Sequence, residues 1–440
     1  MNALRYGLTP KMKPISPRRS ALVAALDVGS SKVVCLIARL RPHGPQQVLT
    51  RRSHAIEVIG FGHTNARGMK AGSVVNLAQA EDAIRQAVDA AERMAGVEIE
   101  SVVLSLSAGR LASELFAADI DIVGSAVSDG DIARVLAAGS RHSLRDGRAV
   151  LHSLPVAYSI DGVDGVRDPR GMLGSRFGVH MHVATTDVAA ARNLMLAVER
   201  GHLDVEAMVA SPYVAGLAVL ADDEADLGAA VVDLGAGTTT MAVFLGGRCV
   251  DLEGFALGGH HVTMDIARGL NAGIADAERI KTLYGSVLAG GSDERDMVTV
   301  PPLSEDEREQ AQFVSRAALV SIIKPRVEEI LEMVRDRLAA TSIAAERRGH
   351  VILTGGASQL AGLPDLASRI LGRSVRIGRP LGIAAAPEAA KGPAFAVAAG
   401  LLVYPQAAHL EHFESRRKRQ LMTGTGGYFT RVGRWLRESF

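Results

Sequence analysis

Two short segments about 200 residues apart share one pattern, and this duplication limits the folds that the chain can adopt. Residues 25–37 read ALDVGSSKVVCLI, and residues 230–247 read AVVDLGAGTTTMAVFLGG. Each is an apolar strand that ends in an aspartate, followed by a glycine-rich turn and a second apolar strand. Backbone amides exposed in such a turn form a concave anion site. The repetition predicts two similar lobes that hold one polyphosphate between two hairpins.

The second hairpin contains residue types that suit phosphate binding. Gly235 and Gly237 let the backbone approach a ligand closely and adopt conformations that side chains disfavour. Thr238 and Thr239 add hydroxyl donors, and Asp233 stands at the strand end, where it could hold a metal ion through water. One such hairpin alone could be a plain turn between two strands. The prediction therefore depends on its repetition near the N-terminus.

A third glycine-containing loop follows a strand at residues 351–359, VILTGGASQ. Gly355 and Gly356 carry no side chain, so a flat base or an α-phosphate could pass close to the backbone. The order of the three loops resembles that of the superfamily of actin, the Hsp70 chaperones and the sugar kinases. A helix expected at ADAERIKTLYG places Glu278 and Lys281 on one face. This pair is either a surface ion pair or, as the resemblance implies, a clamp for ribose and adenine.

Length, charge and cysteine content narrow the class of protein. A chain of 440 residues suits two lobes with insertions. A net charge of +1 predicts no nucleic-acid partner. Cys35 and Cys249 are far apart in predicted strands, which suits a reducing compartment. No apolar run approaches 18 residues and no secretory signal is evident, so we expect no transmembrane helix.

Periodicity predicts further elements. Apolar residues recur at helical spacing over residues 77–95, and this helix should end at Gly96. A long helix is expected over residues 311–340, with a kink or break near Pro325. Residues 112–185 are interpreted as an inserted module of several strands and one short helix.

The two ends of the chain are polar and basic. Residues 1–19 predict a disordered basic tail, either solvated or in contact with anionic lipid or a partner. Residues 411–427 read as a linker, and residues 428–440, YFTRVGRWLRESF, predict an amphipathic helix in a membrane interface. The alternative is a helix docked on the protein's own core. On such a helix the apolar face would span an arc of roughly 140° and consist of Tyr428, Phe429, Val432, Trp435, Leu436 and Phe440. Three arginines would lie on the opposite face, namely Arg431, Arg434 and Arg437.

From about residue 20 to residue 440, the sequence resembles the FtsA family of bacterial cell-division proteins. The resemblance rests on the three loops, the inserted module after SVVLSLSAG, the stretch LHSLPVAYSIDG, and the linker with its terminal helix. It implies an ATP-binding, actin-like protein that polymerises on the cytoplasmic face of the inner membrane at the division site. It also implies that the protein tethers the tubulin-like FtsZ ring and recruits later division proteins.

The resemblance implies a two-lobed α/β fold in which an α+β subdomain replaces the usual small subdomain of lobe 1. In this family the FtsZ tail binds the small subdomain of lobe 2, and the inserted subdomain takes part in filament contacts and in binding FtsN. We expect the following division: tail 1–19; lobe 1 core 20–111, 186–212 and 393–410; inserted subdomain 112–185; lobe 2 core 213–264 and 346–392; small subdomain of lobe 2 265–345; linker 411–427; membrane helix 428–440.

The resemblance also assigns roles to the loop residues. Asp27 and Asp233 would hold Mg²⁺ through water. Gly355, Gly356, Glu278 and Lys281 would hold adenosine. The phosphates would be cradled by Gly29, Ser30, Ser31, Lys32, Gly235, Ala236, Gly237, Thr238 and Thr239.

One departure from the superfamily pattern concerns catalysis. Bacterial actins of the MreB type carry Glu-Pro where the attacking water is oriented, and the matching pair here is Ser211-Pro212. Serine is a poor general base at neutral pH, so we predict slow hydrolysis. The same pair should start a helix, with Ser211 as its N-cap.

Two other functions remain open at this stage. The first is a sugar or acid kinase of the same superfamily, for which the helix around Trp435 has no evident use. The second is a pilus-assembly protein of the PilM type, which also carries an inserted module but should lack the linker and terminal helix.

Overall fold

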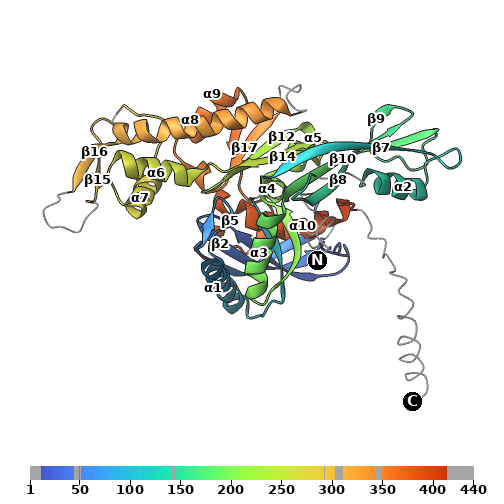
Figure 1. The fold of residues 1–440 in the computed structure, drawn as a ribbon, viewed down its shortest axis with the longest axis horizontal. Helices are drawn as coiled ribbons and strands as arrows, with labels where there is room; N and C mark the ends of the chain where they lie inside the picture. The colour runs from blue at the N-terminus through green and yellow to red at the C-terminus, as the bar shows by residue number, and fades with distance from the viewer. Residues whose placement is uncertain are drawn as a thin grey trace, which may run out of the picture.

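The computed structural model describes residues 11–43, 49, 51–108, 110–140, 145–291, 293–302, 311–341 and 349–413. These residues contain two large sheets, one in each lobe (Figure 1). The lobe 1 sheet has the order β11-β6-β1-β2-β3-β19, with bounds Asp204–Ala210, Ser101–Leu106, Ala21–Val28, Lys32–Pro42, His54–Asn65 and Ile383–Ala384. The lobe 2 sheet has the order β14-β13-β12-β17-β18, with bounds Arg248–Phe255, Thr239–Leu245, Ala229–Leu234, His350–Thr354 and Val375–Ile377.

The two sheets share one topology. In each, the strand that carries the aspartate of the repeated pattern lies inside the sheet. It pairs antiparallel with the outgoing strand of its hairpin and parallel with the strand on its other side. The order β3-β2-β1-β6-β11 in lobe 1 thus corresponds to β14-β13-β12-β17-β18 in lobe 2. The strands around both aspartates are almost fully buried, which explains their continuous apolar runs. The two-lobed duplication predicted from the sequence is confirmed.

Lobe 1 carries helices α1 (Leu77–Ala95) and α3 (Val188–Arg200). The side chain of Asn76 accepts the amide of Gln79 at the start of α1, and Gly96 ends it in the left-handed conformation (φ 67°). The buried face of α1 is mostly alanine, so the helix lies close to strand β3. A Cβ at Gly62 would lie 1.9 Å from the carbonyl oxygen of Ala87. The helix predicted at these residues is confirmed.

Two apolar helices cross in the core. Helix α4 (Ser211–Val219) follows β11 directly, and helix α10 (Ala396–Ala407) returns the chain to lobe 1. Pro393–Leu410 is the described stretch that is long and apolar enough to cross a membrane, but 72 % of it is buried inside the fold. At the start of α4, Ala210 is the N-cap and Ser211 the first helical residue, contrary to the expected cap. The reason is that β11 runs straight into the helix, so Ala210 keeps the extended conformation.

The inserted subdomain forms a separate sheet with its own small core. Its sheet order is β7-β10-β8-β9, and helix α2 covers one side. The elements are β7 (Ala112–Asp121), α2 (Asp129–Gly139), β8 (Arg148–Ile160), β9 (Val163–Val166) and β10 (Arg176–Asp187). Ser128 caps α2 in a capping box with Asp131. Strand β7 also reaches lobe 2, where the Ser113 hydroxyl donates to the Asp251 carboxylate at 2.6 Å.

The small subdomain of lobe 2 lies at the opposite end of the long axis from the inserted subdomain (Figure 1). It contains α6 (Gly259–Gly269), α7 (Ile274–Tyr284), β15 (Met297–Val300), β16 (Gln312–Ser315) and α8 (Arg316–Ala340), and α9 (Leu363–Leu371) packs beside α8. The helix expected over residues 311–340 thus begins only at Arg316, after a short strand. It continues through Pro325 without the expected break, because apolar residues on both sides of the proline are buried in one core.

The first and last described residues of the chain pack against the body, although a free tail and a linker were expected there. Within the predicted tail, Met12 and Ile15 pack on the lobe 1 core. The Lys11 ammonium donates to the carbonyl of Leu151 at 2.8 Å and lies 3.6 Å from the centre of the Phe413 ring. Residues 11–19 are therefore not a disordered tail, and residues 411–413 are packed rather than linker. Residues 1–10 and 414–440, with the whole predicted membrane helix, lie outside the described residues.

The inserted subdomain meets lobe 2 around a buried histidine. His182 of β10 is fully buried (0 % exposed). Burial and the neighbouring His152 lower its pKa to about 3, against an opposing contribution from the backbone of Cys249. The unfolded chain binds a proton at a pKa of about 6.5, whereas the folded chain does not. The stability that the neutral His182 gives at neutral pH is therefore lost as the pH falls below about 6.5, because only the unfolded chain then gains a proton.

We expect the His182→Gln chain to be less sensitive to acid than the native chain. Between pH 7.5 and pH 5.0 the histidine alone should lower the free energy of unfolding by about 2 kcal/mol. Urea unfolding of both chains at the two pH values measures this difference. An equal loss of stability in the two chains would contradict the assignment of a neutral buried His182.

Candidate functional site

A cleft of about 1080 Å³ lies between the two lobes and collects residues from all three glycine-containing loops. It is bounded by both hairpins, by α7 and the start of α6, and by the segment that leads into α10. Most of the residues predicted from the sequence line it, namely Asp27, Gly29, Ser30, Ser31, Lys32, Ser211, Asp233, Gly235, Ala236, Thr238, Glu278, Lys281, Gly355 and Gly356. The sequence pattern therefore located one contiguous site from segments that are far apart in the chain.

The two hairpin turns have the same internal hydrogen bond. The amide of Gly29 donates to the carbonyl of Lys32 at 3.0 Å, and the amide of Gly235 donates to that of Thr238 at 3.0 Å. None of the turn glycines in these hairpins has a positive φ, contrary to the expected unusual conformation. They are required for space instead, since a Cβ at Gly235 would lie 2.8 Å from the carbonyl oxygen of Thr238.

The turns also touch each other across the cleft. A Cβ at Gly237 would lie 2.5 Å from Ser30 Oγ and 3.0 Å from the Cα of Ala71. The same Ser30 hydroxyl accepts the amide of Gly72 at 2.7 Å. Gly237 thus serves the approach of the two lobes, and it does not line the cleft itself.

Two half-buried carboxylates and one lysine form the charged centre of the cleft. Burial raises the pKa of Asp27, although a hydrogen bond from Ser105 (2.6 Å) and the charge of Lys32 oppose this. Burial and the charge of Asp27 raise the pKa of Asp233 to about 7. Lys32 points its ammonium at the carbonyl of Ala394 and lies over a phenylalanine ring. One lysine does not balance the charge of two carboxylates, and this deficit suits a bound cation.

The residues present fit a magnesium ion held mainly by water. Mg²⁺ prefers oxygen ligands and keeps several waters, with one or two protein carboxylates and substrate phosphates completing its shell. Asp27 and Asp233 supply that number of carboxylates. No cluster of three or more histidine, cysteine or acidic side chains suited to a metal occurs in the described part of the chain.

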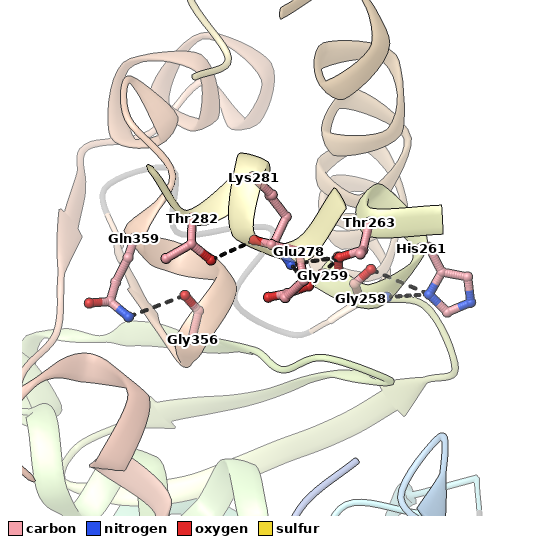
Figure 2. A network of polar contacts seen from close by, with 9 residues as sticks. All are labelled: Gly258, Gly259, His261, Thr263, Glu278, Lys281, Thr282, Gly356 and Gln359. Atoms are coloured by element: carbon pink, nitrogen blue, oxygen red, sulfur yellow. Dashed lines mark hydrogen bonds and ion pairs between the residues drawn. The ribbon is translucent and has the colours of Figure 1, made fainter. Parts of the chain in front are cut away.

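Glu278 and Lys281 form a network on the lobe 2 side of the cleft (Figure 2). The lysine ammonium donates to Glu278 Oε2 at 2.7 Å and to the Thr263 hydroxyl at 2.8 Å. Burial raises the pKa of Glu278, but Lys281 and Thr263 outweigh this and lower the pKa overall. The Lys281 side chain is 12 % exposed and the Glu278 side chain 53 % exposed, and both residues line the cleft. Thr263 was missed because a lone helical threonine carries no sequence signal.

The third loop brings its glycines beside the second hairpin. Gly355 has a φ of 85°, and a Cβ there would lie 2.3 Å from Asp233 Oδ1. At Gly356 a Cβ would meet nothing within 4 Å, so the space above the backbone is open to the cleft. This arrangement leaves room for a flat group between the loop and the helix that carries Glu278.

Some predicted residues lie elsewhere. Thr239 is fully buried and its hydroxyl donates to the carbonyl of Leu257 at 2.8 Å, so it supports the hairpin rather than lining the cleft. Ser211 does line the cleft, is 2 % exposed, and its hydroxyl has no hydrogen-bond partner among the described residues. The membrane residues Phe429, Val432, Trp435, Leu436, Phe440, Arg431, Arg434 and Arg437 lie outside the described part of the chain.

Comparisons with known proteins agree with this architecture. Residues 230–400 match the family described as cell division protein FtsA, and residues 108–185 match the SHS2 domain inserted in FTSA. Cell division protein FtsA of Agrobacterium fabrum is 51 % identical over 436 residues, which is 99 % of this chain and 98 % of that protein.

Solved structures share the fold at low sequence identity. The PilM-PilN type IV pilus biogenesis complex aligns with a TM-score of 0.58 and 19 % identity, over 87 % of this chain and 98 % of that one. MreB 5 of Spiroplasma citri bound to AMPPNP aligns with a TM-score of 0.52 and 14 % identity, over 89 % and 97 %. These likenesses confirm the actin-like fold, and the SHS2 match confirms the inserted subdomain.

Proposed function

This chain belongs to the FtsA family of cell-division proteins, and from that premise we propose that it is an ATP-binding scaffold that polymerises on the membrane and anchors the FtsZ ring. The observation that carries the proposal is the identity of 51 % over 99 % of the chain to a cell division protein FtsA. Membership of the family implies a place at the division site. The kinase and pilus-assembly alternatives lose their support, because the likeness to PilM is one of fold alone.

The cleft supports the binding of ATP with Mg²⁺. Asp27 and Asp233 would hold the ion through water, and the ion would neutralise phosphate charge. Residues of both hairpin turns line the cleft, whereas the first two amides of α6 already donate to the carbonyls of Gly235 and Ala236, at 2.9 and 2.8 Å. Glycine-rich turns of this kind favour phosphate. Gly355, Gly356, Glu278 and Lys281 would hold adenosine on the lobe 2 side.

Slow ATP hydrolysis is expected from the residue at the water-orienting position. The unpartnered hydroxyl of Ser211 can hydrogen-bond a water molecule but is a poor base. The kcat for ATP hydrolysis should therefore stay below about 0.1 s⁻¹, roughly two orders of magnitude below the median kcat of enzymes. Phosphate release at saturating Mg·ATP measures it, with the Asp233→Asn chain as the control for contaminating activity. Turnover at an ordinary enzyme rate would contradict the scaffold proposal for this site.

The membrane tether is proposed from sequence. Residues 428–440 combine an apolar arc with three arginines, and each basic residue near an anionic surface contributes about 1 kcal/mol. A helix this short is marginal in water and should form on the membrane. A single copy would bind reversibly, whereas a filament that presents many copies would bind strongly. Self-association of the actin-like body therefore suits the proposed role as a peripheral protein of the inner membrane.

Liposome co-sedimentation with ATP tests the tether. The full chain should pellet with anionic vesicles and stay in solution with neutral ones, because the arginines need anionic lipid. A chain truncated after Thr425 should stay in solution with both. Equal pelleting of the two chains would mean that the last residues dock on the protein itself, and the proposed membrane anchoring would fail.

The proposed partners fit surfaces at the two ends of the molecule. On the small subdomain of lobe 2, Met297 and Phe313 are 53 % and 66 % exposed, and Phe313 pairs with Thr299 across the β15/β16 hairpin. We place the FtsZ tail there, since exposed apolar patches mark protein-binding sites. On the inserted subdomain, edge strand β7 and the exposed Leu115 and Leu173 offer a surface for neighbouring subunits and for late division proteins such as FtsN.

A further inference from the structure

A buried histidine lies between the cleft and the last described residues of the chain. His152 belongs to β8 of the inserted subdomain and is fully buried (0 % exposed), and the side chain of Glu411 is 2 % exposed. The histidine ring packs against Tyr213 of α4 and Tyr404 of α10, with centroid distances of 5.0 and 6.4 Å. His152 therefore sits where the inserted subdomain, the two core helices and the end of the described chain meet.

The two ring nitrogens of His152 have different partners. The amide of Ala210 donates to Nε2 at 2.9 Å. A backbone amide can only donate, so Nε2 carries no proton and the ring is the neutral tautomer with its proton on Nδ1. Nδ1 then donates to Glu411 Oε1 at 2.9 Å. The ring thus links a backbone amide of lobe 1 to a carboxylate at the C-terminal exit.

Glu411 is held as a buried carboxylate. The Tyr404 hydroxyl donates to the same Oε1 at 2.9 Å. Burial raises the pKa of Glu411, but His152, the charge of Lys11 and the Tyr404 hydroxyl outweigh it and lower the pKa overall. A buried charge with this set of partners is strongly disfavoured once one partner is removed. The position of Glu411 therefore depends on His152.

The next two residues are fixed to the inserted subdomain. The amide of His412 donates to the carbonyl of Ser153 at 2.8 Å, and its carbonyl accepts the Ser140 hydroxyl at 3.1 Å. Phe413 packs against the apolar core of that subdomain. We call Glu411, His412 and Phe413 the root, because the linker and the predicted membrane helix follow them in sequence.

On the other side, the amide held by His152 is next to the cleft. Ala210 is the N-cap of α4, and Ser211 follows it. The Ser211 hydroxyl is buried, lines the cleft and has no hydrogen-bond partner among the described residues. The Ser211 hydroxyl is therefore available to hydrogen-bond a phosphate or a water molecule in the cleft. A ligand that restricts the movement of Ser211 should also restrict the amide of Ala210, because the two residues are adjacent in the chain.

We propose that His152 is a positioning residue that couples ligand binding in the cleft to the docking of the root, by holding the Ala210 amide and the Glu411 carboxylate on its two ring nitrogens. The coupling rests on the proposed ATP site. ATP that orders Ser211 also holds the Ala210 amide, and through the ring it holds Glu411. The root is then docked more firmly in the ATP-bound chain.

Hydrogen exchange of the full chain with and without Mg·ATP tests the coupling. In the native chain, ATP should slow exchange in the peptide that contains the His412 amide by about tenfold, within the usual range for coupled sites. In the His152→Phe chain the ring packing is kept but both nitrogen contacts are lost, so ATP should leave exchange at His412 unchanged. ATP affinity, measured by calorimetry on the same samples, should remain measurable in both chains.

The matched control is His182→Phe, which changes another fully buried histidine of the same subdomain and should retain the ATP effect. If His152→Phe alone leaves Glu411 unpaired and prevents folding, the double variant with Glu411→Met removes both polar partners and should fold without coupling. A tenfold effect of ATP in either uncoupled chain would overturn the proposal. ATP binding with no change at His412 in the native chain would do so too. Failure of the native chain to bind ATP would overturn the proposed function as well.

Discussion

The Gly237→Ala chain should bind ATP about 100-fold more weakly than the native chain while remaining folded. Gly237 does not line the cleft, so the added methyl group does not block the ligand directly. It would instead lie 2.5 Å from Ser30 Oγ, 2.8 Å from Ser30 Cβ and 3.0 Å from the Cα of Ala71. Two of these atoms belong to or adjoin the backbone and cannot rotate away. The lobes would have to separate, and the two hairpins would no longer reach one polyphosphate.

Calorimetric titration with Mg·ATP measures the loss, and two further chains isolate its cause. Gly291→Ala adds the same methyl group where nothing lies within 4 Å, and it should bind as the native chain does. Ser30→Gly combined with Gly237→Ala removes the nearest obstacle and should recover part of the affinity. Native affinity in the Gly237→Ala chain would mean that the lobes are further apart when ATP is bound.

Much of the fold was predictable because its strongest signals are local. The two aspartate-glycine hairpins and the helix at residues 77–95 are short-range patterns, and the structure confirms them. Strand β9 and the hairpin strand β16 were missed because they lie in polar or partly exposed stretches with no clear alternation. A kink or break was predicted near Pro325, and the break does not occur, since tertiary burial of the flanking residues outweighs the lost hydrogen bond.

The candidate site was predictable in outline, and its supporting contacts were not. Asp27, Asp233 and Gly355 belong to sequence motifs. Ser105 and Thr263 contribute hydrogen bonds that form only because other elements pack beside them. Of the two reasons given for the hairpin glycines, the unusual backbone conformation was wrong, and the close approach to a ligand stays a prediction. At Gly237 the need for space arises from two loops brought together, whereas at Gly29 and Gly235 it arises inside each turn, where a Cβ would lie 3.0 and 2.8 Å from a carbonyl oxygen.

The packing of the chain ends was also beyond a local reading. Polar composition predicted free segments at residues 11–19 and 411–413. In the fold, Lys11 lies between Leu151 and Phe413, so the first and last described segments contact each other on the inserted subdomain. Such contacts have a sequence separation of hundreds of residues and no pattern within either segment.

Both lobes depend on the close crossing of α4 and α10. Nearly every residue of these two helices is buried, and α4 starts at the cleft residue Ser211. Gly400 of α10 faces the backbone of Val214 in α4, where a Cβ would lie 1.8 Å from the carbonyl oxygen and 2.4 Å from the carbonyl carbon. The helices are therefore in backbone contact at this point, and any side chain at position 400 would force them apart.

Gly400→Ala should destabilise the protein by about 3 kcal/mol or more, at or above the upper end of the usual cost of overpacking a core. We expect loss of soluble protein at 37 °C and a lower urea midpoint for any that folds. Gly392→Ala is the matched control, because it lies eight residues earlier with φ −74° and its Cβ would be 3.7 Å from the nearest atom. Its stability should be unchanged or slightly raised, since alanine lowers the entropy of the unfolded chain. A native midpoint for Gly400→Ala would show that the helices can separate at no cost, and the two lobes would then not share one rigid core.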